Sequence, residues 1–405
     1  MTPSMPVSGA ILPHERRADI DALRVGALLL LILYHLLLIY SGLDVWRVNA
    51  HQGYWADYII TLLRPWRLAL VFFVGGVAVR FMLEKKPFGS FMADRASKLL
   101  TAFVFAVIVL VPPQRYVRLD EAGQATPGYL DYLLHRAPYV ETSLGFPLPE
   151  FSHAWFLPYL FFYSAIAALL WRFLPRLFGA MQRAVESAPA LLIVAAAALW
   201  FSLFTAAIEP THPPTNMLVD DLIGHLRWGI VFLAGVLLGR SAAFWAKLDA
   251  QKWRIWLAMA LLTPLNVGLL WLHLHDVMQD PAMWRAVRGF YGGVALFGIL
   301  AFAHWAVRKP SPALRYASDA ILPVYLLHQT CLVMAADIVV KLEWPAPIEF
   351  TVLLVATMLI PITIYQLFVR HWMPVRVLFG LRPKHREPPP SPRAAAPPVA
   401  ASGSP

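Results

Sequence analysis

The 405-residue sequence contains a single cysteine, Cys331, and few charged residues, which make up only 14% of the chain. Soluble domains are about 25% charged and roughly 45–50% apolar, whereas 59% of this chain is hydrophobic. One cysteine cannot form an intrachain disulfide, which excludes a secreted disulfide scaffold. So little charge also excludes a soluble enzyme and a disordered protein, and a polytopic membrane protein remains.

The net charge of +10 does not by itself indicate nucleic-acid binding. The sequence has no zinc-finger, helix-turn-helix or glycine-rich nucleotide motif, and the positive-inside rule explains an excess of Lys and Arg in a membrane protein. We therefore expect the lipid bilayer, and no nucleic acid, as the partner of this chain. We also expect no bound metal and no bound cofactor.

Ten apolar segments reach the length of about 20 residues that a helix needs to cross a bilayer. They predict an all-α, polytopic bundle of about ten transmembrane helices. The predicted spans are 23–42, 62–83, 96–113, 153–174, 189–208, 223–245, 253–274, 289–307, 319–340 and 349–372.

The distribution of Lys and Arg predicts the orientation of these spans. A path that starts in the cytoplasm places 24 of the 34 Lys and Arg on the cytoplasmic side, counting Arg24, and 10 on the other side. The positive-inside rule favours this path. Because the number of spans is even, both termini are expected in the cytoplasm.

The chain divides into one membrane domain and two tails. We expect a short cytoplasmic tail at 1–15, a membrane domain at 16–373 and a tail at 374–405 that is first basic and then rich in Pro and Ala. The last segment cannot bury apolar area and is expected to be disordered. Two long outer connections, Pro112–Ser152 and Glu209–Asp221, fit either functional loops or solvated loops.

Ionisable side chains inside a span are costly unless they are paired, so each suggests a functional site. The first span carries Arg24 and, eleven residues later, His35. Eleven residues turn a helix by about 1100°, so the two side chains share a face and lie about 16 Å apart along the axis. Asp21 precedes Arg24 by three residues and can form an ion pair with it. A snorkelling arginine and a core histidine are the structural alternative, but their alignment favours function.

Two basic pairs are further candidates. Arg64 and Arg67 stand at the predicted outer start of the second span, where they are either two donors on one face or an interfacial anchor. Glycines 75 and 76 follow and allow close helix packing. Arg95 and Lys98 lie one turn apart at the predicted cytoplasmic start of the third span. They can hold a phosphate, although ordinary positive-inside charge also explains them.

The remaining candidates are aromatic residues and histidines. His153 and Trp155 open the fourth predicted span, where an aromatic belt is the alternative explanation. Tyr325 and His328 lie three residues apart on one face of the ninth span. His328 is predicted near the depth of His35, and two histidines at a similar depth are harder to explain by packing than one.

In their order and spacing, these motifs resemble the acyltransferase family 3 of integral membrane proteins over residues 16–373. The similar stretches are Asp-Ile-Asp-Ala-Leu-Arg with His35, Phe-Phe-Val-Gly-Gly, the Arg95 and Lys98 pair, His-Ala-Trp-Phe-Leu from His153, and Tyr-Leu-Leu-His ending at His328. Two positions differ from the family, because Val74 precedes the glycines where Ser-Gly is usual, and Lys98 replaces an arginine that would offer a bidentate fork. The motif at His153 most resembles the branch that modifies periplasmic glucans, commonly with succinyl groups.

The resemblance implies an O-acyltransferase of the bacterial cytoplasmic (inner) membrane. It would move an acetyl or succinyl group from a cytoplasmic acyl-CoA, its co-substrate, to a hydroxyl of an extracytoplasmic or membrane-linked carbohydrate. Phosphate charge would be held at the inner lip by cations. The implied donor-binding residues are Arg24, Arg95 and Lys98, the implied catalytic residues are His35, His328 and Asp21, and the implied acceptor-side residues are His153, Trp155, Arg64, Arg67 and Tyr325.

Several alternatives stay open at the level of sequence. The base is His35 or, as second candidate, His328, which can also act as a relay. Direct transfer is favoured over an acyl-enzyme because no Ser or Cys lies convincingly beside a histidine. A transporter or exporter of a lipid-linked glycan or small molecule also uses polar residues in its spans. A sensor or scaffold gives no reason for two histidines at mid-depth, and the residues favour no particular oligomeric state.

Overall fold

The computed structural model describes residues 17–43, 48, 50–124, 128–135, 139–141 and 147–381. The tail predicted at 1–15 lies outside the described residues, as does the predicted disordered segment from Glu387 onward.

Helices make up nearly all of the described chain, which confirms the predicted all-α fold. Within this part of the chain, nine helical segments are long and apolar enough to cross a membrane. They are α1 (Ala18–Ile39), α2 (Tyr54–Leu83), α3 (Phe88–Phe105) with η1 (Ala106–Leu110) and α4 (Val111–Glu121), η2 (Ser152–Trp155) with α6 (Phe156–Phe173), α8 (Ala190–Leu203) with η3 (Phe204–Ile208), α11 (Ala242–Leu274), α12 (Ala282–Ala306), α13 (Pro312–Val339) with η5 (Val340–Leu342), and α14 (Ala346–Ile364) with η6 (Tyr365–Val369).

The other elements are short. They are α5 (Tyr129–His135), the antiparallel strands β1 (Tyr139–Glu141) and β2 (Pro147–Pro149), α7 (Pro175–Ser187), α9 (Leu222–Gly224), η4 (His225–Gly229), α10 (Ile230–Leu238) and α15 (Met373–Leu378).

The sixth predicted span is shorter than the sequence suggested. The region 223–245 folds as one apolar segment, Leu222–Leu238, formed by α9, η4 and α10. It stops early because Ser241 caps the next helix, where its hydroxyl accepts a hydrogen bond from the amide of Phe244 at 3.2 Å. Residues 242–245 therefore belong to α11, and the ten predicted spans become nine long helices and one shorter segment among the described residues.

Helix α2 begins at Tyr54, eight residues before the predicted start at 62. Hydropathy alone missed this first part because it contains the carboxylate of Asp57. That carboxylate is buried but satisfied, since it accepts hydrogen bonds from the Ser41 hydroxyl at 2.5 Å and from the Gly42 amide at 2.8 Å. The basic pair at 64 and 67 consequently lies well inside the helix, and the prediction that it marks the outer start was wrong.

The third span is also longer than predicted. Helices α3 and α4 join through the π-helical turn η1 and continue to Glu121. The long outer connection predicted from Pro112 therefore begins only after Glu121. Gln114 is buried in this added part, and its side-chain amide donates to the carbonyl of Leu110 at 3.0 Å.

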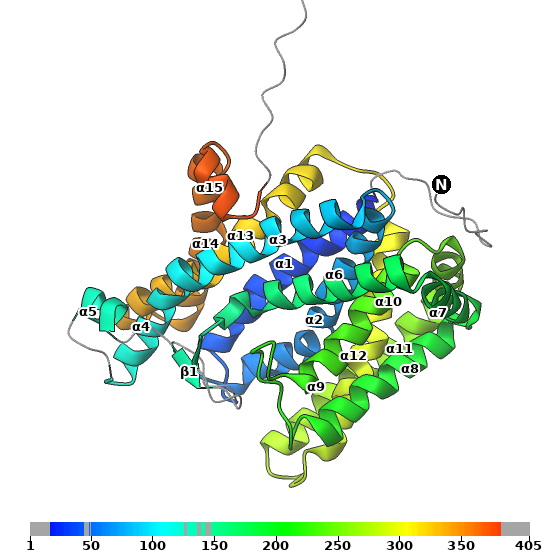
Figure 1. The fold of residues 1–405 in the computed structure, drawn as a ribbon. Coiled ribbons are helices and arrows are strands. Elements are labelled where there is room, and N and C mark those ends of the chain that lie inside the picture. Colours follow the sequence, from blue (N-terminus) through cyan, green and yellow to red (C-terminus); the bar gives the residue numbers. More distant parts are fainter. Residues whose placement is uncertain are drawn as a thin grey trace, which may run out of the picture.

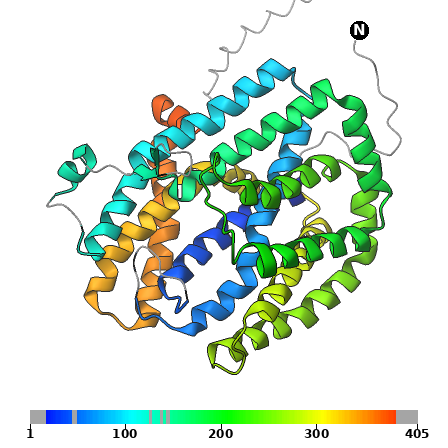
Figure 2. The ribbon, with the colours of Figure 1, turned by 60° about the horizontal axis from the view of Figure 1, so that its bottom comes forward.

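Helices α1 and α2 run through the middle of the bundle (Figure 1), with α4, α13 and α14 on one side and α8, α10 and α11 on the other. The same grouping persists in the turned view (Figure 2). Helix α2 packs tightly on α10, because a Cβ on Gly76 would lie 2.0 Å from the Phe232 carbonyl oxygen and one on Gly235 would lie 2.0 Å from that of Phe73. The close packing predicted for the glycine pair is thus confirmed at Gly76.

The C-terminal end of the described chain packs on the second half of α3. Gly380 has a φ of +68°, and a Cβ there would lie 2.2 Å from the Lys98 carbonyl oxygen. The rings of Phe379 and Phe105 meet at 5.0 Å beside this contact. Only glycine fits this backbone conformation and this spacing.

Candidate active site

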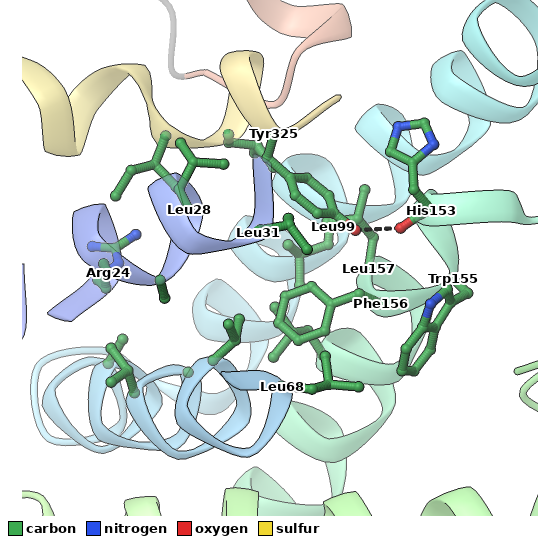
Figure 3. Close-up of a pocket in the computed structure, with 18 of the residues that line it drawn as sticks. Arg24, Leu28, Leu31, Leu68, Leu99, His153, Trp155, Phe156, Leu157 and Tyr325 are labelled. Atoms are coloured by element: carbon green, nitrogen blue, oxygen red, sulfur yellow. Dashed lines mark hydrogen bonds between the residues drawn. The ribbon is translucent and has the colours of Figure 1, made fainter. Parts of the chain in front are cut away.

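One cavity brings together residues from α1, α2, α3, η2, α6 and α13. Arg24 stands at one end, and His153 and Trp155 stand at the other (Figure 3), with Leu31 and Phe156 between them. We call these the inner end and the outer end, after the orientation predicted from Lys and Arg. Of the residues singled out in the sequence, the following line this cavity: Arg24, His35, Arg67, Arg95, Lys98, His153, Trp155 and Tyr325.

Three cations predicted to bind the donor line the cavity, namely Arg24 at the inner end, Arg95 and Lys98, and Arg24 acts electrostatically on Arg95. Arg24 forms the expected ion pair with Asp21, with 3.8 Å between its Nη1 and the carboxylate Oδ1. Asp21 itself does not line the cavity. Its carboxylate lies behind Arg24 and accepts a hydrogen bond from the Ser318 hydroxyl of α13 at 3.0 Å.

Arg95 is almost fully buried and is held by helix α6. Its Nε and Nη2 both donate to the hydroxyl of Ser164, at 3.2 and 2.9 Å. The hydroxyl in turn donates a hydrogen bond to the carbonyl of Leu160 at 2.5 Å. Arg95 is therefore oriented by a neutral group, so its positive charge is available to an anion in the cavity.

The two histidines predicted at similar depth are hydrogen-bonded to each other across α1 and α13. Nδ1 of His35 lies 3.0 Å from Nε2 of His328, and the rings stack with centroids 5.2 Å apart. His328 is fully buried and does not line the cavity, whereas His35 does. His35 thus faces the cavity and His328 supports it from behind.

The hydrogen bonds of this pair determine the tautomers. Nδ1 of His328 lies 2.5 Å from the Tyr325 carbonyl oxygen, which can only accept, so this nitrogen carries the proton. Nε2 of neutral His328 then accepts from Nδ1–H of His35. The lone pair of neutral His35 consequently resides on Nε2, the nitrogen that a general base uses.

His153 completes a cluster of three histidines, since its ring meets that of His328 edge-on at 5.7 Å. Its Nε2 donates to the Leu326 carbonyl at 2.9 Å, and the Tyr325 hydroxyl donates to its backbone carbonyl. Figure 3 shows this last contact between α13 and η2. Two hydrogen bonds therefore hold the segment at His153 on α13, the helix that carries His328. Residues of an aromatic belt at the membrane interface would not need such contacts.

The two arginines of α2 occupy different environments, although the sequence suggested one shared face. Arg67 is 7% exposed, lines the cavity and places its guanidinium carbon 3.7 Å from the ring centroid of Tyr34. Arg64 is exposed and does not line the cavity. Three residues turn a helix by about 300°, so the two side chains stay only about 60° apart, and Arg64 still acts electrostatically on Arg67.

A family model described as an acyltransferase domain (Acyl_transf_3) matches residues 17–366. The chain belongs to the acyltransferase 3 family. It is therefore an O-acyltransferase and a multi-pass integral membrane protein. No curated protein matches the chain, and no solved structure does.

For an acyltransferase, the cavity offers a histidine, several cations and apolar walls. Among its described lining residues there is no Ser, Thr or Cys. Cys331 lies elsewhere in α13 as a free thiol. Within the part of the chain that the structure describes, no group of three or more His, Cys, Asp or Glu is arranged to hold a metal ion.

Sequence reasoning missed two kinds of site residue. Ser164 and Gln114 are polar residues in apolar spans. Nothing in the sequence tells whether such a hydroxyl or amide binds a side chain of the site or only the backbone of its own helix. Arg227 and Arg288 were counted only as outer charge, yet Arg227 is buried, and each stacks on a tryptophan, at 4.5 and 4.6 Å. A charged residue at the start of a predicted span was the available signal for both.

Proposed function

We propose that this acyltransferase moves an acetyl or succinyl group from a cytoplasmic acyl-CoA to a carbohydrate hydroxyl on the far side of the bacterial cytoplasmic membrane. The observation that carries the proposal is a single cavity with cations at its inner end and His35 deeper inside. An uncharged thioester can enter such a cavity, whereas the phosphates of CoA cannot leave polar surroundings without a large cost.

Three cations support binding of the CoA phosphates at the inner end. Arg24, Arg95 and Lys98 come from two helices and line the same cavity. Arg24 and Arg95 are close enough to repel each other electrostatically. A bound phosphate would relieve that repulsion and form charge-assisted hydrogen bonds, which are roughly twice as strong as neutral ones.

The histidine pair supports general-base catalysis. Nε2 of His35 removes the proton from the sugar hydroxyl as its oxygen attacks the thioester carbonyl. The carbon–sulfur bond then breaks, and the proton passes from His35 to the departing thiolate of CoA. His328 accepts the Nδ1–H of His35 and so orients the base and stabilises its cationic form, while Asp21 positions Arg24.

Direct transfer is supported by the composition of the cavity wall. An acyl-enzyme would need a nucleophilic hydroxyl or thiol beside His35. The described lining residues include no Ser, Thr or Cys, and the hydroxyls of Tyr325 and Ser164 each donate a hydrogen bond to a backbone carbonyl. The acyl group therefore passes from sulfur to the acceptor oxygen in one displacement, through a tetrahedral intermediate.

At the outer end, the aromatic side chains support a carbohydrate acceptor. Trp155 and Tyr325 line the cavity beside His153, and flat apolar rings with polar edges suit the faces and hydroxyls of a sugar. Together with the motif at His153, this arrangement favours a glucan in the periplasm as the acceptor.

The test compares cell-envelope glycans from cells with and without this protein by mass spectrometry. We expect one class of glycan to lose a mass corresponding to an acetyl or succinyl ester when the protein is absent. Purified protein in lipid vesicles should consume acyl-CoA only when an acceptor is present. Export of a glycan without consumption of acyl-CoA would instead identify a transporter and overturn the proposal.

A further inference from the structure

Arg67 is a buried cation for which the described residues supply no counter-charge. Its side chain is 93% buried, and neither Nε nor Nη1 has a hydrogen-bond partner among the described residues. The groups that act on it electrostatically are Tyr34, Tyr325 and Arg64, without a carboxylate. A buried charge of this kind costs several kcal/mol unless something else compensates it.

Arg67 also lies next to the reacting centre. Its guanidinium stacks on Tyr34, the residue before His35, and the rings of Tyr34 and His35 are 5.6 Å apart. Both Arg67 and His35 line the cavity. A group bound to Arg67 would therefore belong to the same molecule that reacts at His35, or to its co-substrate.

Arg64 adds to the positive field at Arg67 rather than reducing it, and it also acts on Arg227 and Arg288. Arg227 is paired with Glu209, at 3.1 Å between Nη1 and Oε2. Glu209 also acts on Arg288 but is not among the groups that act on Arg67. The carboxylate of Glu209 therefore compensates Arg227 and Arg288 and leaves Arg67 uncompensated.

We propose that Arg67 binds a carboxylate of the substrate, so that this cavity selects an anionic substrate. The inference rests on the proposed acyl transfer and names its substrate class. A carboxylate carries the single negative charge that one uncompensated guanidinium requires, and the planar fork can hold it through two hydrogen bonds. The carboxylate belongs either to a dicarboxylic acyl group on the donor or to an acidic sugar of the acceptor.

The test measures kcat/KM for two matched pairs of substrates with the purified full-length protein in lipid vesicles. The donors are succinyl-CoA and acetyl-CoA, and the acceptors are a neutral glucose oligomer and the same oligomer with one uronic acid. Wild-type protein should prefer the charged member of one pair, and that pair identifies the source. Arg67→Gln should lower the preference about ten- to a hundredfold, because charge-assisted hydrogen bonds are lost. Arg118→Gln is the matched control, since Arg118 is exposed and does not line the cavity.

Arg67→Lys keeps the charge and removes the fork, so it should retain part of the preference and fold even where Arg67→Gln does not. Equal losses for the charged and neutral members in either variant would overturn the inference, as would a wild-type preference for the neutral member of both pairs.

A binding measurement separates this inference from the proposed function. Succinate should raise the thermal unfolding temperature of wild-type protein and of Arg118→Gln. It should leave that of Arg67→Gln unchanged and raise that of Arg67→Lys by less than that of the wild type. If no acyl-CoA is consumed by any form, the proposed function fails while the succinate shift still decides the role of Arg67. Equal shifts in all variants, or none in the wild type, would contradict a carboxylate site.

Discussion

The cavity is lined by arginines in different surroundings, and the protein treats their charges differently. Arg24 at the inner end is 36% exposed at its side chain and paired with Asp21, and Arg95 is oriented by Ser164. Arg67, deeper in the cavity, is 7% exposed and has two guanidinium nitrogens that no described residue satisfies. Charge at a lip is explained by solvent and by the positive-inside rule, whereas charge at depth requires a ligand. The exposure and the partners of each side chain, rather than residue type, therefore separate the two roles.

The comparison depends first on which end faces the cytoplasm, and an all-or-none experiment decides this. Reporter fusions after Glu121 and after Arg386 should report opposite sides of the membrane, with Arg386 in the cytoplasm. The physical reason is the excess of Lys and Arg along the path that starts in the cytoplasm. Reporters on the same side would contradict the predicted topology, and opposite sides with Arg386 outside would exchange the inner and the outer end.

The largest catalytic effect is expected at His35. Replacement of His35 by Ala should lower kcat by about 10²–10⁴-fold, because the general base is lost. His35→Gln retains a hydrogen-bonding group but cannot take a proton, so it should be about as inactive. Acyl transfer from radiolabelled acyl-CoA in vesicles measures the rate, and His371→Ala, at an exposed histidine, is the control. A Gln variant that recovers most of the rate would make His35 structural and transfer the role of base to His328.

A smaller effect is expected at the inner end. Arg24→Ala should raise KM for acyl-CoA by about ten- to a hundredfold, because a charge-assisted hydrogen bond to phosphate is lost, and should change kcat much less. Steady-state kinetics with varied acyl-CoA measures both constants. Arg308→Ala, an exposed arginine on the same predicted side, should leave both unchanged. Unchanged dependence on the donor in Arg24→Ala would remove Arg24 from the donor site.

The smallest effect is expected at Asp21, which pairs with Arg24 at the inner end of the cavity. Asp21→Asn should raise KM for acyl-CoA about two- to fivefold, since a partly exposed ion pair contributes little, and it should leave kcat intact. Ser318→Ala tests the same support from α13 and should resemble it. A lower KM in Asp21→Asn would show instead that the carboxylate competes with the CoA phosphates for Arg24.

The candidate site was largely visible in the sequence where a short-range rule applied. The ion pair between Asp21 and Arg24 and the shared face with His35 follow from helix geometry within one span. The early start of α2 was not visible in the sequence, because the carboxylate of Asp57 lowers the local hydropathy. Hydrogen bonds from Ser41 and Gly42 offset the cost of burying this carboxylate, and they are seen only in the structure.

The different fates of Arg64 and Arg67 could not be read from their spacing either. Two positions three residues apart lie about 60° apart around a helix, and their spacing alone does not tell which of the two lines a cavity. Which of them faced the cavity depended on where α1 and α13 pack against α2. The hydrogen bond between Ser164 and Arg95 likewise joins residues 69 positions apart, for which no local pattern exists.

By itself, the sequence determined that this protein is an α-helical membrane bundle of the acyltransferase 3 family, because hydropathy over about 20 residues and the spacing of motifs are local properties of a chain. The tertiary structure alone decided that His328 stands behind His35, and that Arg67 rather than Arg64 enters the cavity. These outcomes depend on contacts between helices far apart in the sequence. Such contacts are set by side-chain packing and by the cost of leaving a buried polar group without a partner.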